Sequence, residues 1–119
     1  MRDKRFPRSV YGVGTEPDPR FSLANERTFL AWIRTSLALL AVGIGIEALA
    51  LPIQPVLRFT AGLIFVLLSL IAVVHAWVSW RRDERALRAG GVLPGPSTGM
   101  VIVGGVMLAT LLMVVGFFL

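Results

Sequence analysis

The chain has no cysteine and a single histidine, and these shortages remove several classes of function. Without cysteine there is no disulfide, no thiolate metal site and no cysteine nucleophile. His75 alone cannot build a zinc site, which needs several ligands at close spacing. The sequence also lacks a phosphate-binding glycine loop followed by lysine, and no serine or tyrosine has a base beside it. We therefore expect no enzyme, no bound metal and no cofactor.

Lysine is nearly absent as well, because eleven of the twelve basic residues are arginine. Only seven acidic residues oppose them, so the formal net charge is +5. These arginines flank hydrophobic runs, where they orient a protein in a membrane and contact anionic headgroups. The expected partner of the basic residues is thus the lipid bilayer, and we expect no nucleic acid.

Hydrophobic residues make up 55% of the chain, with a mean hydropathy of +0.76, and they occur in long runs. A helix needs roughly 20 apolar residues to cross a hydrocarbon core of about 30 Å. Three runs meet this requirement, at about 29–51, 57–79 and 100–119. Too few residues remain for a separate soluble core. The sequence therefore predicts an all-α integral membrane protein with three transmembrane helices.

The first 21 residues are polar and contain three prolines, which is typical of an irregular segment. We interpret 1–21 as a flexible basic cytoplasmic tail and 22–119 as a three-span membrane domain. Ser22 or Asn25 is the expected N-cap of the first long helix, because both side chains accept hydrogen bonds from free backbone N–H groups.

Two short sequences separate the spans. The two prolines of "LPIQP" interrupt the helix after the first span, so spans one and two are expected to form an antiparallel hairpin. The second helix is expected to continue past its membrane segment to Ala89, where Gly90 and Gly91 end it.

The basic residues also predict the orientation. Those before the first span are Arg2, Lys4, Arg5, Arg8, Arg20 and Arg27, and those after the second are Arg81, Arg82, Arg85 and Arg88. The hairpin has Arg58 alone, so the positive-inside rule predicts a cytoplasmic N-terminus and an external C-terminus. A cleaved leader ending at "ALA" (48–50) is disfavoured, because it would be very long and two spans follow it.

One stripe of the first span combines charge with small side chains. Steps of four and three residues place arginine, alanine or glycine on one face, at Arg27, Ala31, Arg34, Ala38, Ala41, Gly45 and Ala48. Small residues let membrane helices approach closely. Arg34 is therefore expected to face protein or an enclosed aqueous path rather than lipid.

Two interpretations of Arg34 stay open at this point. A long arginine side chain near the boundary can reach back to the headgroups, or pair with Glu26. Alternatively, Arg27 and Arg34 form an anion-binding entrance, with Glu26 and Asn25 as supporting or gating residues. Near the opposite boundary, Glu47 and Arg58 are expected to form a structural ion pair. His75 has no assigned role.

The segment "DPRFSLANERTFLAWIRTSLALLAVGIGI" closely resembles the opening of the DUF202 family, with its hallmark "LANERTFLAWIRTSLAL". The basic end of the second span, "WRRDERAL", agrees with the same family. Its bacterial members include small inner membrane proteins, so the resemblance implies a multi-pass location in the inner (plasma) membrane.

The family is also similar to the membrane part of the eukaryotic vacuolar transporter chaperone complex. There, five copies surround a polyphosphate channel, so the resemblance implies a homo-oligomer of about five copies, with Arg27 and Arg34 at its entrance. The chain has none of the soluble catalytic domains that make polyphosphate in that complex. Two functions follow as expectations: a conduit for an anion or polyanion, or a non-conducting scaffold subunit of a membrane complex.

Overall fold

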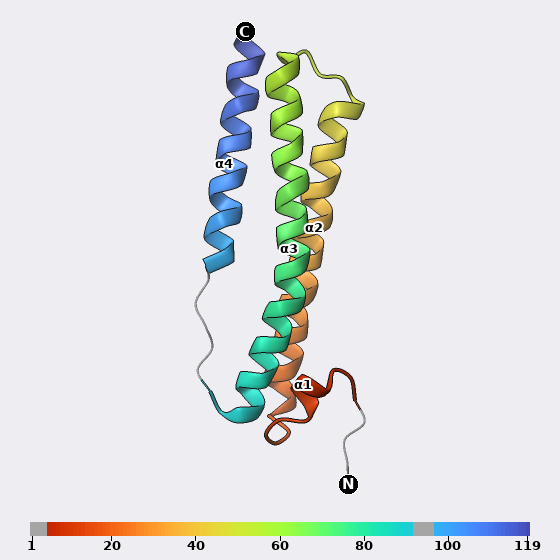
Figure 1. The fold of residues 1–119 in the computed structure, drawn as a ribbon, viewed down its shortest axis with the longest axis vertical. Helices are drawn as coiled ribbons and strands as arrows, with labels where there is room; N and C mark the ends of the chain where they lie inside the picture. The colour runs from red at the N-terminus through yellow and green to blue at the C-terminus, as the bar shows by residue number, and fades with distance from the viewer. Residues whose placement is uncertain (1–4, 92–96) are drawn as a thin grey trace.

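A computed structural model describes residues 5–91 and 97–119 of the chain. It contains a short helix α1 (Arg8–Tyr11) and three long helices, α2 (Pro19–Ala48), α3 (Pro55–Ala89) and α4 (Ser97–Phe118). The long helices run antiparallel in an elongated bundle of 64 × 24 × 20 Å (Figure 1). α3 is the central helix, because α1, α2 and α4 each pack against it and α2 does not pack against α4.

Three helices are long and apolar enough to cross a membrane, which confirms the predicted class. α1 and the last turn of α4 lie at opposite ends of the bundle (Figure 1). We call the end with α1, the first turns of α2 and the last turns of α3 the basic end. The other, with the α2–α3 connection and the last turn of α4, is the hairpin end. The basic residues Arg2 and Lys4 lie outside the described residues, as do residues 92–96 between Gly91 and α4.

The two longest helices begin in the same way, with a polar cap followed by proline. Asp18 accepts a hydrogen bond from the Arg20 backbone N–H at 2.9 Å, and Gln54 accepts one from the Leu57 N–H at 2.9 Å. Proline fits the first helical position because its missing N–H would have no helical acceptor. The predicted cap at Ser22 or Asn25 is therefore wrong, since both residues lie inside α2.

The end of α3 agrees with the prediction. The helix stops at Ala89, and Gly90 follows with a φ of +72°, a left-handed conformation that glycine adopts without steric cost.

Small residues bring α2 and α3 together. A Cβ on Gly43 would lie 2.8 Å from the Gly62 carbonyl oxygen, so the two backbones touch there. About two turns nearer the basic end, the buried Ser36 hydroxyl donates to the Ser69 carbonyl at 2.9 Å. This hydrogen bond satisfies a polar group that lipid would leave without a partner.

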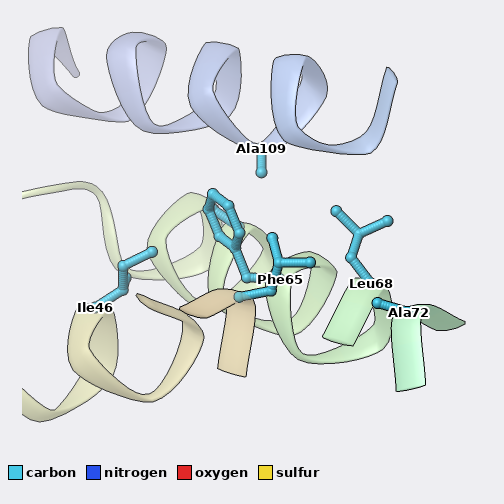
Figure 2. Packing of buried hydrophobic residues seen from close by; sticks show 7 residues of the cluster. Ile46, Phe65, Leu68, Ala72 and Ala109 are labelled. Atoms are coloured by element: carbon cyan, nitrogen blue, oxygen red, sulfur yellow. The ribbon is translucent and has the colours of Figure 1, made fainter. Parts of the chain in front are cut away.

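The buried apolar cluster continues from this contact to α4. Figure 2 shows Ala109 of α4 facing Phe65 and Leu68 of α3, with Ile46 of α2 on the other side. Gly105 lets α4 approach, because a Cβ there would lie 2.6 Å from a Leu68 methyl group. At the hairpin end, the Gln54 N–H donates to the Gly116 carbonyl at 2.9 Å.

The length of α4 sets the level of the membrane. Its 22 residues rise about 33 Å, close to the thickness of the hydrocarbon core. Gly105 is level with Leu68, so Ser97, eight residues earlier, is level with about Ala76 of α3. Beyond Ala76, α3 carries Trp77, Trp80 and then a run of arginines, which is the order expected across a headgroup region.

The N-terminal segment differs from the predicted irregular tail. Residues 8–11 form α1, which packs on α3, and Val10 is fully buried. Gly14 has a φ of +61°, and a Cβ there would lie 2.1 Å from the Arg88 carbonyl oxygen. The segment is thus folded against the basic end by contacts with residues more than 70 positions away, which local composition does not reveal.

Candidate functional site

Arg27 and Arg34 project from the side of α2 that faces away from α3. At 100° per residue, Arg34 lies two and a half turns from Asn25, which contacts α3, and so points in the opposite direction. Both arginines are exposed, and among the described residues neither makes a hydrogen bond or ion pair. The structure therefore places the two predicted entrance residues together on an outer face that the chain itself leaves uncovered.

The same outer face carries the small residues of the predicted stripe. All are exposed or half-exposed, so the stripe is not used in packing α2 on α3; they are Ala31, Ala38, Ala41, Gly45 and Ala48. The face that packs on α3 is a different one and includes Trp32, Leu39, Gly43 and Ile46.

Arg27 and Arg34 lie at different depths along the membrane-spanning part of the bundle. The Trp32 ring contacts the His75 ring, with 4.4 Å between centroids, so Arg34 is level with about residue 73 of α3. That position is about 5 Å inside the level where α4 begins, and Arg27 is about 10 Å farther out. Arg34 thus lies just within the apolar zone and Arg27 in the headgroup zone.

The two predicted supporting residues lie elsewhere. Asn25 is buried and donates to the Trp80 carbonyl at 3.1 Å and to Glu84 at 3.4 Å, so it holds α2 on α3. Glu26 is exposed on a third side of α2, and in the described structure no ion pair joins it to Arg27 or Arg34.

Glu47 and Arg58 meet at the hairpin end. The Arg58 Nε lies 3.3 Å from the Glu47 carboxylate, and its Nη1 donates to the Leu51 carbonyl at 2.9 Å. These bonds tie the ends of α2 and α3 across their connection, which is a structural arrangement.

Sequence reasoning missed a second cluster of charges at the basic end. Arg88, only 7% exposed, donates to the carbonyls of Tyr11 and Val13 at 3.1 and 2.8 Å, and to Glu16 at 3.0 Å. Its partners are about 75 residues away in the chain, so no local pattern indicates them.

Two further arginines of α3 hold the N-terminal segment. Arg81 donates to the Ser9 hydroxyl at 2.8 Å and Arg85 to the Ser9 carbonyl at 2.5 Å. At the start of α2, an ion pair with Arg20 holds the pKa of Asp18 below its ordinary value. Several arginines of the basic end are therefore committed to structure, whereas Arg27 and Arg34 are not.

The exposed guanidiniums of Arg27 and Arg34 are suited to the recognition of negative charge. The described residues contain no group of three metal-ligating side chains. Two guanidiniums about two turns apart on one helix face, without partners among the described residues, attract anionic groups, and their attraction strengthens where water is scarce.

Comparison with known proteins places this chain among small membrane proteins. The family described as "Domain of unknown function (DUF202)" matches residues 20–86. The chain is 44% identical over 91 residues to inner membrane protein YidH of Escherichia coli K12, covering 76% of this chain and 79% of YidH. It is 40% identical over 91 residues to the uncharacterized protein Rv2272 of Mycobacterium tuberculosis H37Rv, covering 75% of each. No solved structure matches the chain.

Proposed function

The chain belongs to the DUF202 family of small multi-pass proteins of the inner membrane, and on that premise we propose that its copies assemble around a shared axis. In this assembly the outer face of α2 lines the axis, and Arg27 and Arg34 form a basic entrance for an anion or a polyphosphate-type polyanion. The observation that carries the proposal is the position of these two arginines on the face of α2 opposite α3, without partners among the described residues.

The packing order of the helices requires more than one copy for a conduit. α2 and α4 both pack on α3 and not on each other, so the three long helices enclose no passage among themselves. The outer stripe of α2 is built of alanine and glycine around the arginines, and small residues allow helices of neighbouring copies to approach. A shared axis would therefore remove Arg34 from lipid and place it opposite its equivalents.

Several copies of the entrance around one axis would attract anions more strongly than a single copy does. Several copies of Arg27 and Arg34 in a narrow, low-dielectric mouth would focus field lines and raise the local anion concentration. Rings of arginine select for anions in pores by the same means. We also propose that the basic end is cytoplasmic, because most arginines lie there and cytoplasmic segments carry the excess of arginine and lysine.

A scaffold is the second candidate, and the composition of the stripe favours it. Beyond Arg34 the stripe contains only Ala38, Ala41, Gly45 and Ala48, which offer an ion no polar group. Such a face packs closely against another helix and excludes water. In that case the protein holds a membrane complex together, and Arg34 pairs with an acidic group of a partner or reaches the headgroups.

Native mass in nanodiscs, followed by anion flux in liposomes, separates the two functions. The conduit requires one closed oligomer of several copies and a measurable flux of phosphate or short polyphosphate. Arg34→Ala is expected to lower that flux at least about tenfold, since it removes about 1.4 kcal/mol or more of attraction per mouth, while leaving the oligomer intact.

The matched control is Arg82→Ala, which removes one charge from an exposed side chain of the same end. Its flux should stay within about twofold of the unchanged protein, because the charge lies off the proposed axis. A monomer or dimer, or an oligomer without flux, would exclude the conduit and leave the scaffold. Equal losses in both variants would show that net charge alone acts.

A further inference from the structure

A cleft of about 500 Å³ opens at the basic end, on a different side of the bundle from Arg27 and Arg34. Four aromatic side chains line it: Tyr11 from α1, Phe29 from α2, and Trp77 and Trp80 from α3. Trp80 is central, with ring centroids 6.4 Å from Tyr11, 6.4 Å from Phe29 and 5.5 Å from Trp77. We call it the interfacial cleft, because Trp77 and Trp80 lie just beyond the level where α4 begins.

The charges that line the interfacial cleft do not balance. Among the described residues, three carboxylates (Glu16, Glu26 and Glu84) face two guanidiniums (Arg5 and Arg88), which leaves one negative charge in excess. Glu16 already pairs with both arginines. Among the described residues, neither Glu26 nor Glu84 has a cationic partner.

Glu84 shows the imbalance most clearly. It is only 4% exposed, and its carboxylate receives two neutral donors: the Ser22 hydroxyl at 3.3 Å and the Asn25 amide at 3.4 Å. A buried carboxylate is costly unless a positive charge or strong donors compensate it. The long distances of both hydrogen bonds leave room for a stronger donor on the side that faces the cleft.

Aromatic rings beside these carboxylates favour a cation as the missing group. The faces of aromatic rings attract ammonium and guanidinium groups, and the cleft already contains two such contacts. The Arg5 guanidinium lies 4.3 Å and that of Arg88 5.3 Å from the Tyr11 ring centroid.

The level of the cleft indicates where such a cation comes from. Trp77 and Phe29 occupy the height at which headgroups meet acyl chains, where tryptophan is enriched. We propose that the interfacial cleft binds the ammonium group of a zwitterionic phospholipid headgroup, with Glu26 and Glu84 as its acceptors and Trp80 beneath it. Arg5, on the wall of the same cleft, provides a positive charge near the headgroup phosphate.

This site is independent of the proposed function, because Arg27 and Arg34 lie on another face of α2. Either proposal can fail without affecting the other.

Native mass spectrometry of the protein in nanodiscs tests the lipid site. Phosphatidylethanolamine, which carries a primary ammonium, is expected to remain bound at least about fivefold more than phosphatidylglycerol, which has none. Glu26→Gln and Glu84→Gln should each reduce this preference to about twofold or less, since an amide keeps the shape and loses the charge. The control is Glu47→Gln, a carboxylate at the hairpin end, which should keep the full preference.

Glu26→Gln tests the site without the risk that the protein misfolds. Glu26 is exposed and makes no contact that the fold needs, so its loss of preference cannot be ascribed to unfolding. Equal binding of the two lipids by the unchanged protein would overturn the proposal. So would a preference that survives both substitutions.

A soluble amine is the remaining alternative source of the cation. Free phosphoethanolamine is expected to leave the bound lipid in place at millimolar concentration. If it instead displaces the lipid, the ligand is a soluble amine and the lipid assignment is wrong. If Glu84→Gln separates the copies while the lipid preference persists, the partner of Glu84 is a neighbouring copy, and the proposal is likewise wrong.

Discussion

Gly14 fixes the N-terminal segment to the bundle. Its φ of +61° is unfavourable for residues with a side chain, and an added Cβ would lie 2.1 Å from the Arg88 carbonyl oxygen. The clash would also strain the hydrogen bond from the Thr15 N–H to that oxygen, which is 3.2 Å long. A methyl group added at this position would therefore weaken the contacts that hold the N-terminal segment on α3.

We expect Gly14→Ala to release the N-terminal segment from α3. The left-handed backbone alone costs an alanine about 1–3 kcal/mol, and the clash adds to that. Limited trypsin cleavage after Arg8 should then become at least about tenfold faster. Thr15→Ala is the control, because it keeps the backbone hydrogen bond. Unchanged cleavage of Gly14→Ala would mean that the segment does not depend on this contact.

At the scale of elements, the packing of α2 on α3 depends on Gly43 and not on Gly45. A Cβ on Gly43 would lie 2.8 Å from the Gly62 carbonyl oxygen and 2.8 Å from a Val66 methyl group. At Gly45, two residues later, nothing lies within 4 Å of an added Cβ. Gly43 thus lies on the face of α2 that packs on α3, and Gly45 lies on the opposite face. The same substitution at the two positions can therefore be compared.

Gly43→Ala should destabilise the bundle by about 1–3 kcal/mol, the usual cost of overpacking a well-packed contact. Gly45→Ala should be neutral or slightly stabilising within one chain, because alanine favours helix more than glycine does. Unfolding in mixed micelles of mild detergent and dodecyl sulfate, followed by circular dichroism, measures both. Equal effects of the two substitutions would contradict the described packing of α2 on α3.

The elements also show how far sequence reasoning reaches. The spans were predictable because length and hydropathy decide whether a helix crosses a bilayer, and the stop at Gly90 because a left-handed residue ends a helix. The start at Pro19 was not, because Ser22 and Asn25 resemble caps and are instead used in contacts with α3. The docking of residues 8–16 depends on Arg88, Arg81 and Arg85, whose distance along the chain hides it.

Part of the candidate site was likewise predictable from the sequence, and part was not. The periodicity of α2 indicates that Arg27 and Arg34 share one face with alanine and glycine. It does not indicate what that face meets, because the answer depends on neighbouring copies or lipid. The interfacial cleft was missed, since its walls come from three helices and the excess of carboxylates in it is recognised only when contacts between distant residues are known.

For the whole molecule, the uneven distribution of arginine determines how the chain should sit in the membrane. The ends of the bundle differ in charge: among the described residues, Arg58 is the only arginine of the hairpin end, and it is paired with Glu47. The basic end has most of the other arginines that the structure describes, including four in the last turns of α3. Moving such a cluster across a membrane is strongly disfavoured, so from the positive-inside rule we expect the basic end to be cytoplasmic.

Because the chain has no cysteine, a single introduced cysteine reports this orientation without background. Leu49→Cys, at an exposed position of the hairpin end, should react with a membrane-impermeant maleimide added outside intact spheroplasts. Ala89→Cys, exposed at the basic end, should react only after the membrane is permeabilised. The reverse pattern would place the basic end outside, and Arg27 and Arg34 would then face anions from the external side, where the proposed cytoplasmic entrance could not operate.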